Sequence, residues 1–240
     1  MPHANIVEIF GSVTSPDHLP TTDGPVRLLI TAKAVSASSQ RLIAYCSCQL
    51  TGSPMPFNLR VDRSTLAEGE TLTLQAGCGT APGEDSQVVR TRLPVPLDGQ
   101  RRIGPLTLQL EPVTDSPQTD ALKMPIEPVV ISLSLSVVIP EALVKADTHL
   151  DVTLLRVQQD GQSNRVSSNI AGASMQHGGN GSPFTLYLDA NVLTENDRLK
   201  LHVAQYNQER SKALAGYVVR DLGPNDLRDF GEVILRAPRQ

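Results

Sequence analysis

Residues 183–201 show the clearest alternation of hydrophobic and polar positions in the chain. Phe184, Leu186 and Leu188 are separated by single, more polar residues, which places the three apolar side chains on one face of an extended strand. Asp189 follows directly and is expected to end that strand, because Asp side chains favour turns. The pattern therefore predicts a β-strand that stops at a tight turn.

The segment after Asp189 is predicted to form a single helical turn and then a second strand. Leu193 follows Asp189 at a spacing that suits an Asp N-cap or an Asx turn and that directs the leucine into the core. Alternation resumes at Leu199, Leu201 and Val203. We interpret this unit as a core element without chemistry of its own.

A more degenerate copy of this strand-turn-strand unit lies 127 residues earlier, where Phe57 and Asp62 correspond to Phe184 and Asp189. The predicted core of the two copies consists of Phe57, Leu59, Leu66, Leu72 and Leu74, and of Phe184, Leu186, Leu193, Leu199 and Leu201. The same offset aligns Gly104, Leu106 and Leu108 with Gly231, Val233 and Leu235. Self-similarity over so long a period predicts an internal duplication.

The duplication and the chain length together predict two domains. A chain of 240 residues is long enough for two domains that each bury a core. Residues 113–128 hold three prolines and four charged residues without periodicity, which is typical of a linker. We therefore expect one domain at 1–112, the linker at 113–128 and a second domain at 129–240.

Short apolar segments separated by turn-forming residues predict an all-β fold. The expected strands are 6–13, 26–30, 42–50, 56–61, 72–74, 88–93, 106–110, 129–138, 150–154, 166–171, 184–188, 199–203, 213–220 and 232–236. Residues 77–86 and 175–182 are predicted to be loops, and Gly104-Pro105 to interrupt the chain before a strand. This spacing favours two tandem antiparallel β-sandwiches of about seven short strands each.

Composition supports β structure and argues against two classes of partner. Aromatic residues make up 3% of the chain and Trp is absent, so the cores must consist of Val, Leu and Ile. The formal net charge is −4 with no basic stretch, which argues against nucleic-acid binding. No apolar run reaches the roughly 20 residues of a membrane-spanning helix, so no transmembrane segment is expected.

Three cysteines are the first candidates for chemistry. Cys46 and Cys48 share one face of a predicted strand, and Cys78 follows next to a predicted loop. Free thiols and a disulfide from Cys46 or Cys48 to Cys78 both remain open, and a metal site lacks a convincing fourth ligand. We expect no metal and no cofactor.

The histidines do not form a recognisable catalytic motif. His149 shares a strand face with Asp151, His202 lies opposite the core face of its strand, and His3 and His18 fall outside these patterns. No nucleophile-elbow motif accompanies them. The enzymatic alternative is a small hydrolase with a loop-borne site around His177, and solvated histidines are the other interpretation.

Four features follow one another in the second half of the chain: an opening strand, the turn Ile139-Pro140-Glu141-Ala142-Leu143, the strand at 150–154 and the unit at 182–201. In this combination the second half resembles the YscW/YbaY-like family of small bacterial lipoproteins, which includes type III secretion pilotins and lipoprotein chaperones. The similarity covers residues 129–237, and residues 5–112 follow it through the internal repeat. The resemblance implies β-sandwiches in the cell envelope.

These observations lead us to expect a non-enzymatic binding or assembly module. An exposed edge strand can accept an extended segment of a protein partner, and the resemblance implies an envelope or secretion component as that partner. The resemblance also implies that the protein is located in the periplasm or cell envelope. A chain that begins natively at Met1 is instead expected in the cytoplasm, because it shows neither a signal peptide nor a lipidation cysteine.

Overall fold

The computed structural model describes residues 5–14, 26–79, 87–97, 99–112, 127–159 and 165–238, and this part of the chain is all β. The first half contains β1 (Ile6–Thr14), β2 (Val26–Val35), β3 (Gln40–Leu50), β4 (Met55–Asp62), β5 (Thr71–Gly79), β6 (Gln87–Val95), β7 (Arg102–Gln109) and β8 (Glu111–Pro112). The second half contains β9 (Val130–Val138), β10 (Thr148–Gln159), β11 (Arg165–His177), β12 (Gly181–Asp189), β13 (Leu199–Tyr206), β14 (Ala213–Leu222) and β15 (Gly231–Ile234). Single 3₁₀ turns are η1 (Arg63–Thr65), η2 (Glu141–Leu143), η3 (Ala190–Val192) and η4 (Pro224–Asp226).

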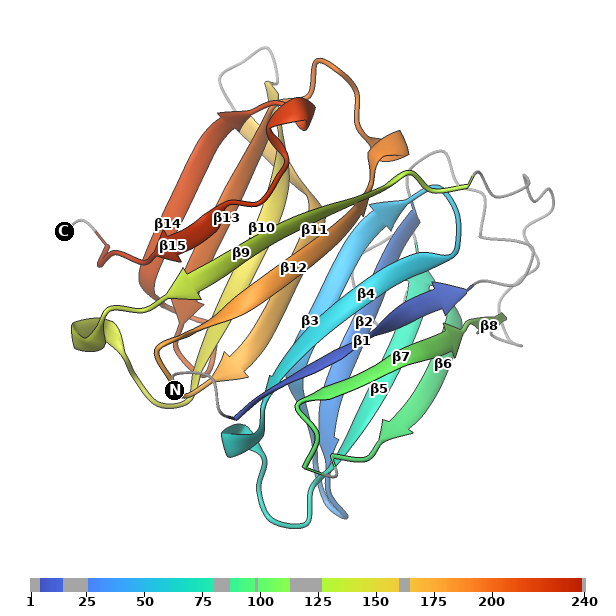
Figure 1. Ribbon diagram of the computed structural model, residues 1–240, viewed down its shortest axis with the longest axis vertical. Helices are drawn as coiled ribbons and strands as arrows, with labels where there is room; N and C mark the ends of the chain where they lie inside the picture. The colour runs from blue at the N-terminus through green and yellow to red at the C-terminus, as the bar shows by residue number, and fades with distance from the viewer. Residues whose placement is uncertain are drawn as a thin grey trace.

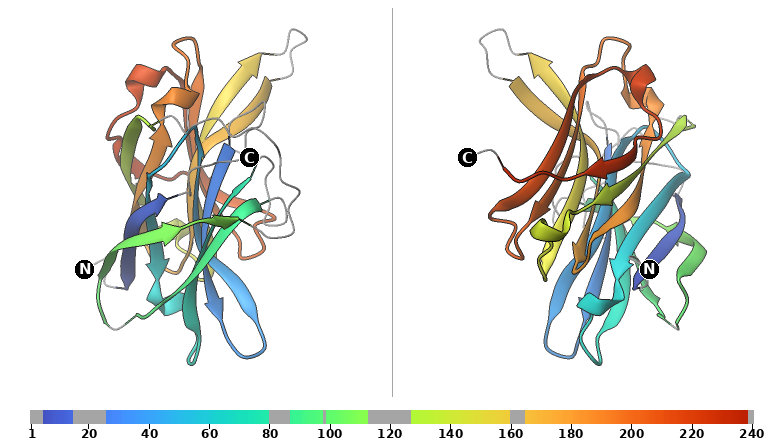
Figure 2. Two further views of the ribbon diagram at one scale, coloured as in Figure 1. Left: turned by 90° about the vertical axis from the view of Figure 1, so that its right-hand side faces the viewer. Right: turned by 60° about the vertical axis from the view of Figure 1, so that its left-hand side comes forward.

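The strands form two layers. One layer is a nine-stranded sheet in the order β14-β13-β10-β11-β3-β2-β5-β6-β8. The other consists of two three-stranded sheets, β4-β1-β7 and β12-β9-β15, which lie side by side on one face of the large sheet (Figure 1; Figure 2, left). The sandwich architecture is thus confirmed, but the two sandwiches share one continuous sheet.

Each half also contains one parallel strand pair, which the prediction of antiparallel sandwiches missed. β7 pairs in parallel with β1, and β15 pairs in parallel with β9. The remaining ladders are antiparallel in the described part of the chain. β7 and β15 each return beside the first strand of their half, which requires the chain to cross from one layer to the other.

The two halves repeat the same strand registers. Ala32 of β2 pairs with Ala44 and Leu74, and Leu154 of β10 pairs with Ala171 and Leu201. Both partners of Leu154 are 127 residues after the partners of Ala32, so Leu74 and Leu201 correspond at that offset. The last strand of each half departs from that offset. Leu110 N–H donates to Thr14 and Leu235 N–H donates to Val138, which makes these two leucines equivalent.

The alignment of the last strands was therefore wrong by two residues. Leu108 and Leu110, and not Leu106 and Leu108, correspond to Val233 and Leu235. Both pairs are buried, whereas Leu106 is half-buried. Insertions between strands shift the offset locally, and pattern matching alone does not register them.

The halves are joined through equivalent strands. β3 and β11 pair antiparallel from Ala44 opposite Met175 to Cys48 opposite Ala171. Cys46 pairs with Ala173, its own counterpart at the 127-residue offset, so an approximate two-fold axis passes through this pair. The pairing removes two exposed strand edges at once. The division into two domains stays a prediction, and residues 113–126 of the expected linker lie outside the described residues.

The repeated core residues lie where the alternation placed them. Phe57 and Phe184 are 2% and 3% exposed, and they belong to one hydrophobic cluster that extends through both halves. The other buried members of the predicted set are Leu59, Leu72, Leu74, Leu186, Leu199 and Leu201. Leu66 and Leu193 are half-buried and pack against the same cluster from the ends of η1 and η3.

Three predicted loops or breaks lie wholly or partly within strands. Residues 77–79 belong to β5, and residues 80–86 of that predicted loop lie outside the described residues. The predicted loop at 175–182 is reduced to a turn at 178–180, because β11 extends to His177 and β12 begins at Gly181. Gly104-Pro105 lies inside β7. Glycine is typical of turns, but cross-strand pairing overrides that preference at 77–79 and at both ends of the 175–182 segment. Gly104-Pro105 instead lies at a register shift in the pairing of β7 with β1.

Asp62 and Asp189 cap equivalent turns and also connect the halves. Asp62 accepts hydrogen bonds from Ser64 N–H at 2.9 Å and from Gly178 N–H of the other half at 3.2 Å. Asp189 likewise accepts from its own turn and from Thr51 N–H of the other half at 2.8 Å. Thr51 and Gly178 are themselves 127 residues apart. The predicted Asp caps are confirmed, and each Asp also accepts a hydrogen bond from the other half of the chain.

The Asp62 carboxyl is expected to contribute to acid sensitivity. Burial would raise its pKa, but His177, Ser64 and Gly178 N–H outweigh burial and lower the pKa to about 2. Because this value lies below the roughly 3.9 of an unfolded Asp, the stabilisation is present above about pH 4 and lost as the pH falls towards 2. Urea unfolding at several pH values should show a smaller acid loss in Asp62→Asn than in the wild type. The exposed Glu195→Gln variant should keep the wild-type slope, and equal slopes in all three proteins would contradict the assignment.

Candidate functional site

His177 is a buried structural residue at the end of β11. Its side chain is 2% exposed, and its Nε2 accepts a hydrogen bond from Gly181 N–H at 2.9 Å. Its Nδ1 lies 3.6 Å from Asp62 Oδ2. A substrate has no access to an imidazole enclosed in this way. The loop-borne hydrolase site therefore loses the residue on which it was centred.

A polar cluster on the outer face of the large sheet includes the predicted neighbours His149 and Asp151. Arg210, from the β13–β14 hairpin, lies across them. Its Nη2 is 3.2 Å from His149 Nδ1, donates to Ser174 Oγ at 2.6 Å, and lies 3.7 Å from Asp151. Its guanidinium also stands 5.3 Å from the centre of the Tyr45 ring. No sequence pattern indicated Arg210 or Ser174, because the position of the hairpin on the sheet brings them together only in the tertiary structure.

This cluster does not have the chemistry of a hydrolase. The Ser174 hydroxyl donates to Asp151 and not to a histidine. Burial lowers the pKa of His149, and the adjacent Arg210 charge lowers it further. Nδ1 of a neutral His149 accepts from Arg210, so serine and histidine are not a nucleophile and its base. The contacts fasten the hairpin to the sheet. His202 lies on the same outer face, and burial lowers its pKa as well.

The three cysteines are free thiols in β3 and β5. Cys48 and Cys78 both pair with Leu28 of β2, from opposite sides. One intervening strand separates their Cα atoms by about 10 Å, beyond the roughly 7 Å limit for a disulfide. Cys46 lies further from Cys78, because it pairs with Ile30, two residues along β2 from Leu28. A bridge to Cys78 would therefore require the backbone to move.

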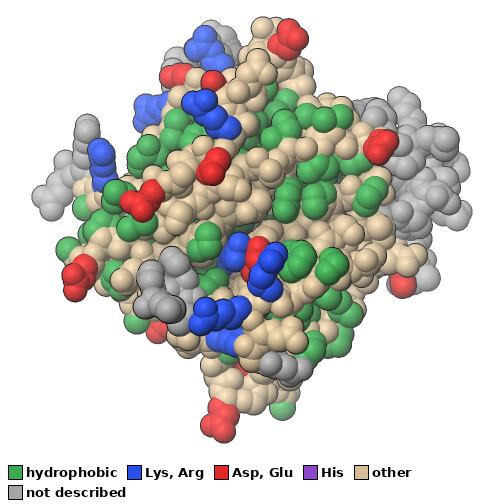
Figure 3. Space-filling view, viewed as in Figure 1, with side chains coloured by type: hydrophobic (Ala, Val, Ile, Leu, Met, Phe, Trp, Pro, Cys, Tyr) green, Lys and Arg blue, Asp and Glu red, His purple; other side chains and the backbone are tan. Residues whose placement is uncertain are grey.

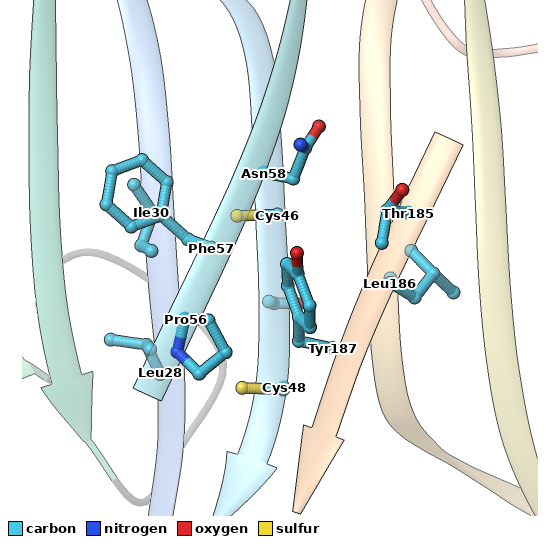
Figure 4. Close-up of a pocket in the computed structure, with 12 residues that line it drawn as sticks. Leu28, Ile30, Cys46, Cys48, Pro56, Phe57, Asn58, Thr185, Leu186 and Tyr187 are labelled. Atoms are coloured by element: carbon cyan, nitrogen blue, oxygen red, sulfur yellow. The ribbon is translucent and has the colours of Figure 1, made fainter. Parts of the chain in front are cut away.

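A small apolar groove lies over the paired strands β3 and β11, between β4 and β12. Figure 4 shows Cys46 and Cys48 pointing the same way from β3, with Tyr187 of β12 beside them. Burial raises the pKa of Cys46 to about 12, although its sulfur accepts a hydrogen bond from Asn58 N–H. Both thiols stay protonated at neutral pH, because burial also raises the pKa of Cys48. The groove is suited neither to nucleophilic nor to metal chemistry.

The strands that border this groove are poor sites for adding a further strand. β4 and β12 lie close together without pairing, and Pro56 and Pro183 occupy equivalent positions on them. Proline lacks an N–H group and therefore blocks part of a strand edge. On the surrounding face Glu8 binds Arg60 and Arg102, and uncharged side chains cover most of the view in Figure 3. The edges available to a partner lie further out.

The outer corner between β14 and β15 is a largely unpaired strand edge of the second half. Gly216 and Arg236 exchange both backbone hydrogen bonds there, at 2.9 and 3.1 Å. From this bridge the two strands run apart (Figure 2, right). Val218 and Ile234 are the next residues whose backbone groups would face each other, and they are 38% and 50% exposed. We call this feature the β14–β15 corner, defined by Gly216, Val218, Ile234 and Arg236.

Two further properties follow from the described residues alone. They contain no helix that is long and apolar enough to cross a membrane. They also contain no group of three His, Cys, Asp or Glu side chains arranged to hold a metal ion.

Comparisons with known proteins give only distant structural similarity. No model of a protein family and no curated protein matches the chain. An alternative pilotin from the type II secretion system of Vibrio cholerae is 18% identical over 44% of this chain and 97% of its own length, with a TM-score of 0.34. The shaft pilin SpaA of Lactobacillus rhamnosus GG is 12% identical over 98% of this chain and 99% of its own, with a TM-score of 0.24. Similarity at this level does not assign a function.

Proposed function

We propose that the protein is a non-enzymatic binding or assembly module that takes up an extended segment of a protein partner by strand addition. The observation that carries this proposal is the divergence of β14 and β15 after a single bridge between Gly216 and Arg236. Beyond the bridge, β14 keeps hydrogen-bonding groups that no other strand of the described chain pairs with. An added strand would satisfy them.

The surroundings of the corner suit a strand rather than a compact ligand. Successive residues of a strand direct their backbone groups alternately to its two sides, so Val218 points its N–H and C=O the same way as Gly216. The Gly216–Arg236 bridge shows that this edge already accepts an antiparallel segment of the chain itself. A partner segment would continue that ladder.

A synthetic peptide tests the strand-addition mode directly. The probe is a lysine-flanked peptide with the core Thr-Val-Ile-Val-Thr, and its control carries N-methyl groups on alternate core amides. Strand addition needs the backbone N–H groups that methylation removes, so only the unmethylated peptide should bind in fluorescence anisotropy. Absence of binding, or equal binding of both peptides, would overturn the proposed function.

We further propose the cell envelope as the compartment and a YscW/YbaY-like ancestry for both halves. Support for this comes from the sequence resemblance and from the repeated registers of β2 to β5 and β10 to β13. The oxidation state of the cysteines is a poor marker of compartment, because β2 separates Cys78 from Cys46 and Cys48. Fractionation of the native host followed by immunoblotting would locate the protein.

A further inference from the structure

The two halves carry the same corner with different side chains. In the first half, Arg90 of β6 pairs with Glu111 of β8, as Gly216 pairs with Arg236 in the second half. The registers of β5 with β6 and of β13 with β14 make Arg92 the counterpart of Val218. The matching bonds of Leu110 and Leu235 make Gln109 the counterpart of Ile234.

Only the second half presents apolar side chains at this position. Arg92 and Gln109 are exposed and polar, as expected for a strand edge that faces water. Val218 and Ile234 are exposed and apolar, and they are among only four exposed large hydrophobic residues in the described part of the chain. Exposed apolar residues beside an unpaired strand edge are costly unless a partner covers them.

We infer that the β14–β15 corner of the second half is the partner site and that its occupant is an extended segment with consecutive apolar, β-branched residues. This inference rests on the proposed function and names its site and its partner chemistry. The residue opposite Val218 in an added strand would lie beside Val218 and Ile234, on the outer face. Its two neighbours would point inward.

The inward side of the corner is also apolar. Tyr217 and Val219 flank Val218 on β14 and are half-buried against the core cluster. Phe230, just before β15, packs against the same cluster. In an added strand, the two neighbours of the residue opposite Val218 would therefore contact hydrophobic side chains. Together with the residue opposite Val218 itself, this favours apolar residues at three successive positions of the partner. Charged residues at these positions would be rejected by desolvation.

A reciprocal exchange of side chains between the two corners tests the assignment. Val218→Arg combined with Ile234→Gln gives the second half the polar pair of the first. This variant should bind the Thr-Val-Ile-Val-Thr probe on the order of tenfold more weakly or worse. Arg92→Val combined with Gln109→Ile is the matched control, which makes the reverse change at the first corner and should keep the original site. All four residues are exposed, so both variants should keep the wild-type thermal unfolding midpoint.

Hydrogen exchange locates the peptide independently of affinity. Probe binding to the wild type should slow amide exchange at Val218 and leave Arg92 unchanged. Wild-type affinity in the Val218→Arg, Ile234→Gln variant, with binding still abolished by N-methylation, would overturn the site but preserve strand addition as the function. Equal binding of the methylated peptide would overturn both.

Discussion

Asp189→Ala is expected to lower the free energy of unfolding by about 4 kcal/mol, because it removes a buried carboxylate that accepts four hydrogen bonds. Asp189 is fully buried and accepts from Thr51 N–H at 2.8 Å, Asn191 N–H at 3.0 Å and Val129 N–H at 3.1 Å. The Thr51 hydroxyl donates to it at 2.6 Å. Alanine removes the acceptor of all four hydrogen bonds, although Val129 and Asn191 lie at the surface, where water can partly replace it.

The same substitution should weaken the connection between the halves, since Thr51 belongs to the first half and Asp189 to the second. Chemical denaturation followed by circular dichroism measures the effect. Glu195→Ala, a nearby exposed carboxylate, is the control and should change stability by less than about 0.5 kcal/mol. A loss below about 1 kcal/mol in Asp189→Ala would show that these hydrogen bonds do not stabilise the fold as argued.

Phe57→Ala and Phe184→Ala are each expected to destabilise the protein by about 3–5 kcal/mol, because each leaves a cavity in a closely packed core. The two side chains occupy equivalent positions and are almost equally buried. They belong to one core cluster, and β3 and β11 make one sheet of the two halves. Each substitution should therefore shift one common unfolding transition.

Calorimetry distinguishes a shared from a divided fold. A single transition that moves to lower temperature in both variants would show cooperative unfolding of the halves. Two transitions, only one of which moves in each variant, would instead show that the halves unfold independently. Near-neutral effects in both variants would contradict the assignment of these residues to the core.

Local patterns predicted the strand-turn-strand unit of each repeat correctly. Alternation of apolar residues at Phe184, Leu186 and Leu188 sufficed to predict β12 and its buried face, because successive side chains of a strand point to opposite sides. Asp62 and Asp189 predicted the caps of η1 and η3, because an Asp side chain bonds to the backbone within its own turn. Such interactions are short in sequence and leave a readable pattern.

The joining of the repeats was decided by the tertiary structure. β3 and β11 pair through backbone groups that every residue carries, so no side-chain pattern predicts the continuous sheet. The Arg210 cluster depends on where a hairpin lies across the large sheet. The β14–β15 corner likewise depends on where two strands diverge, and Val218 and Ile234 are ordinary strand residues in the sequence. Local sequence patterns specify the all-β repeat, whereas contacts between distant strands specify which strand edges are paired and which remain unpaired.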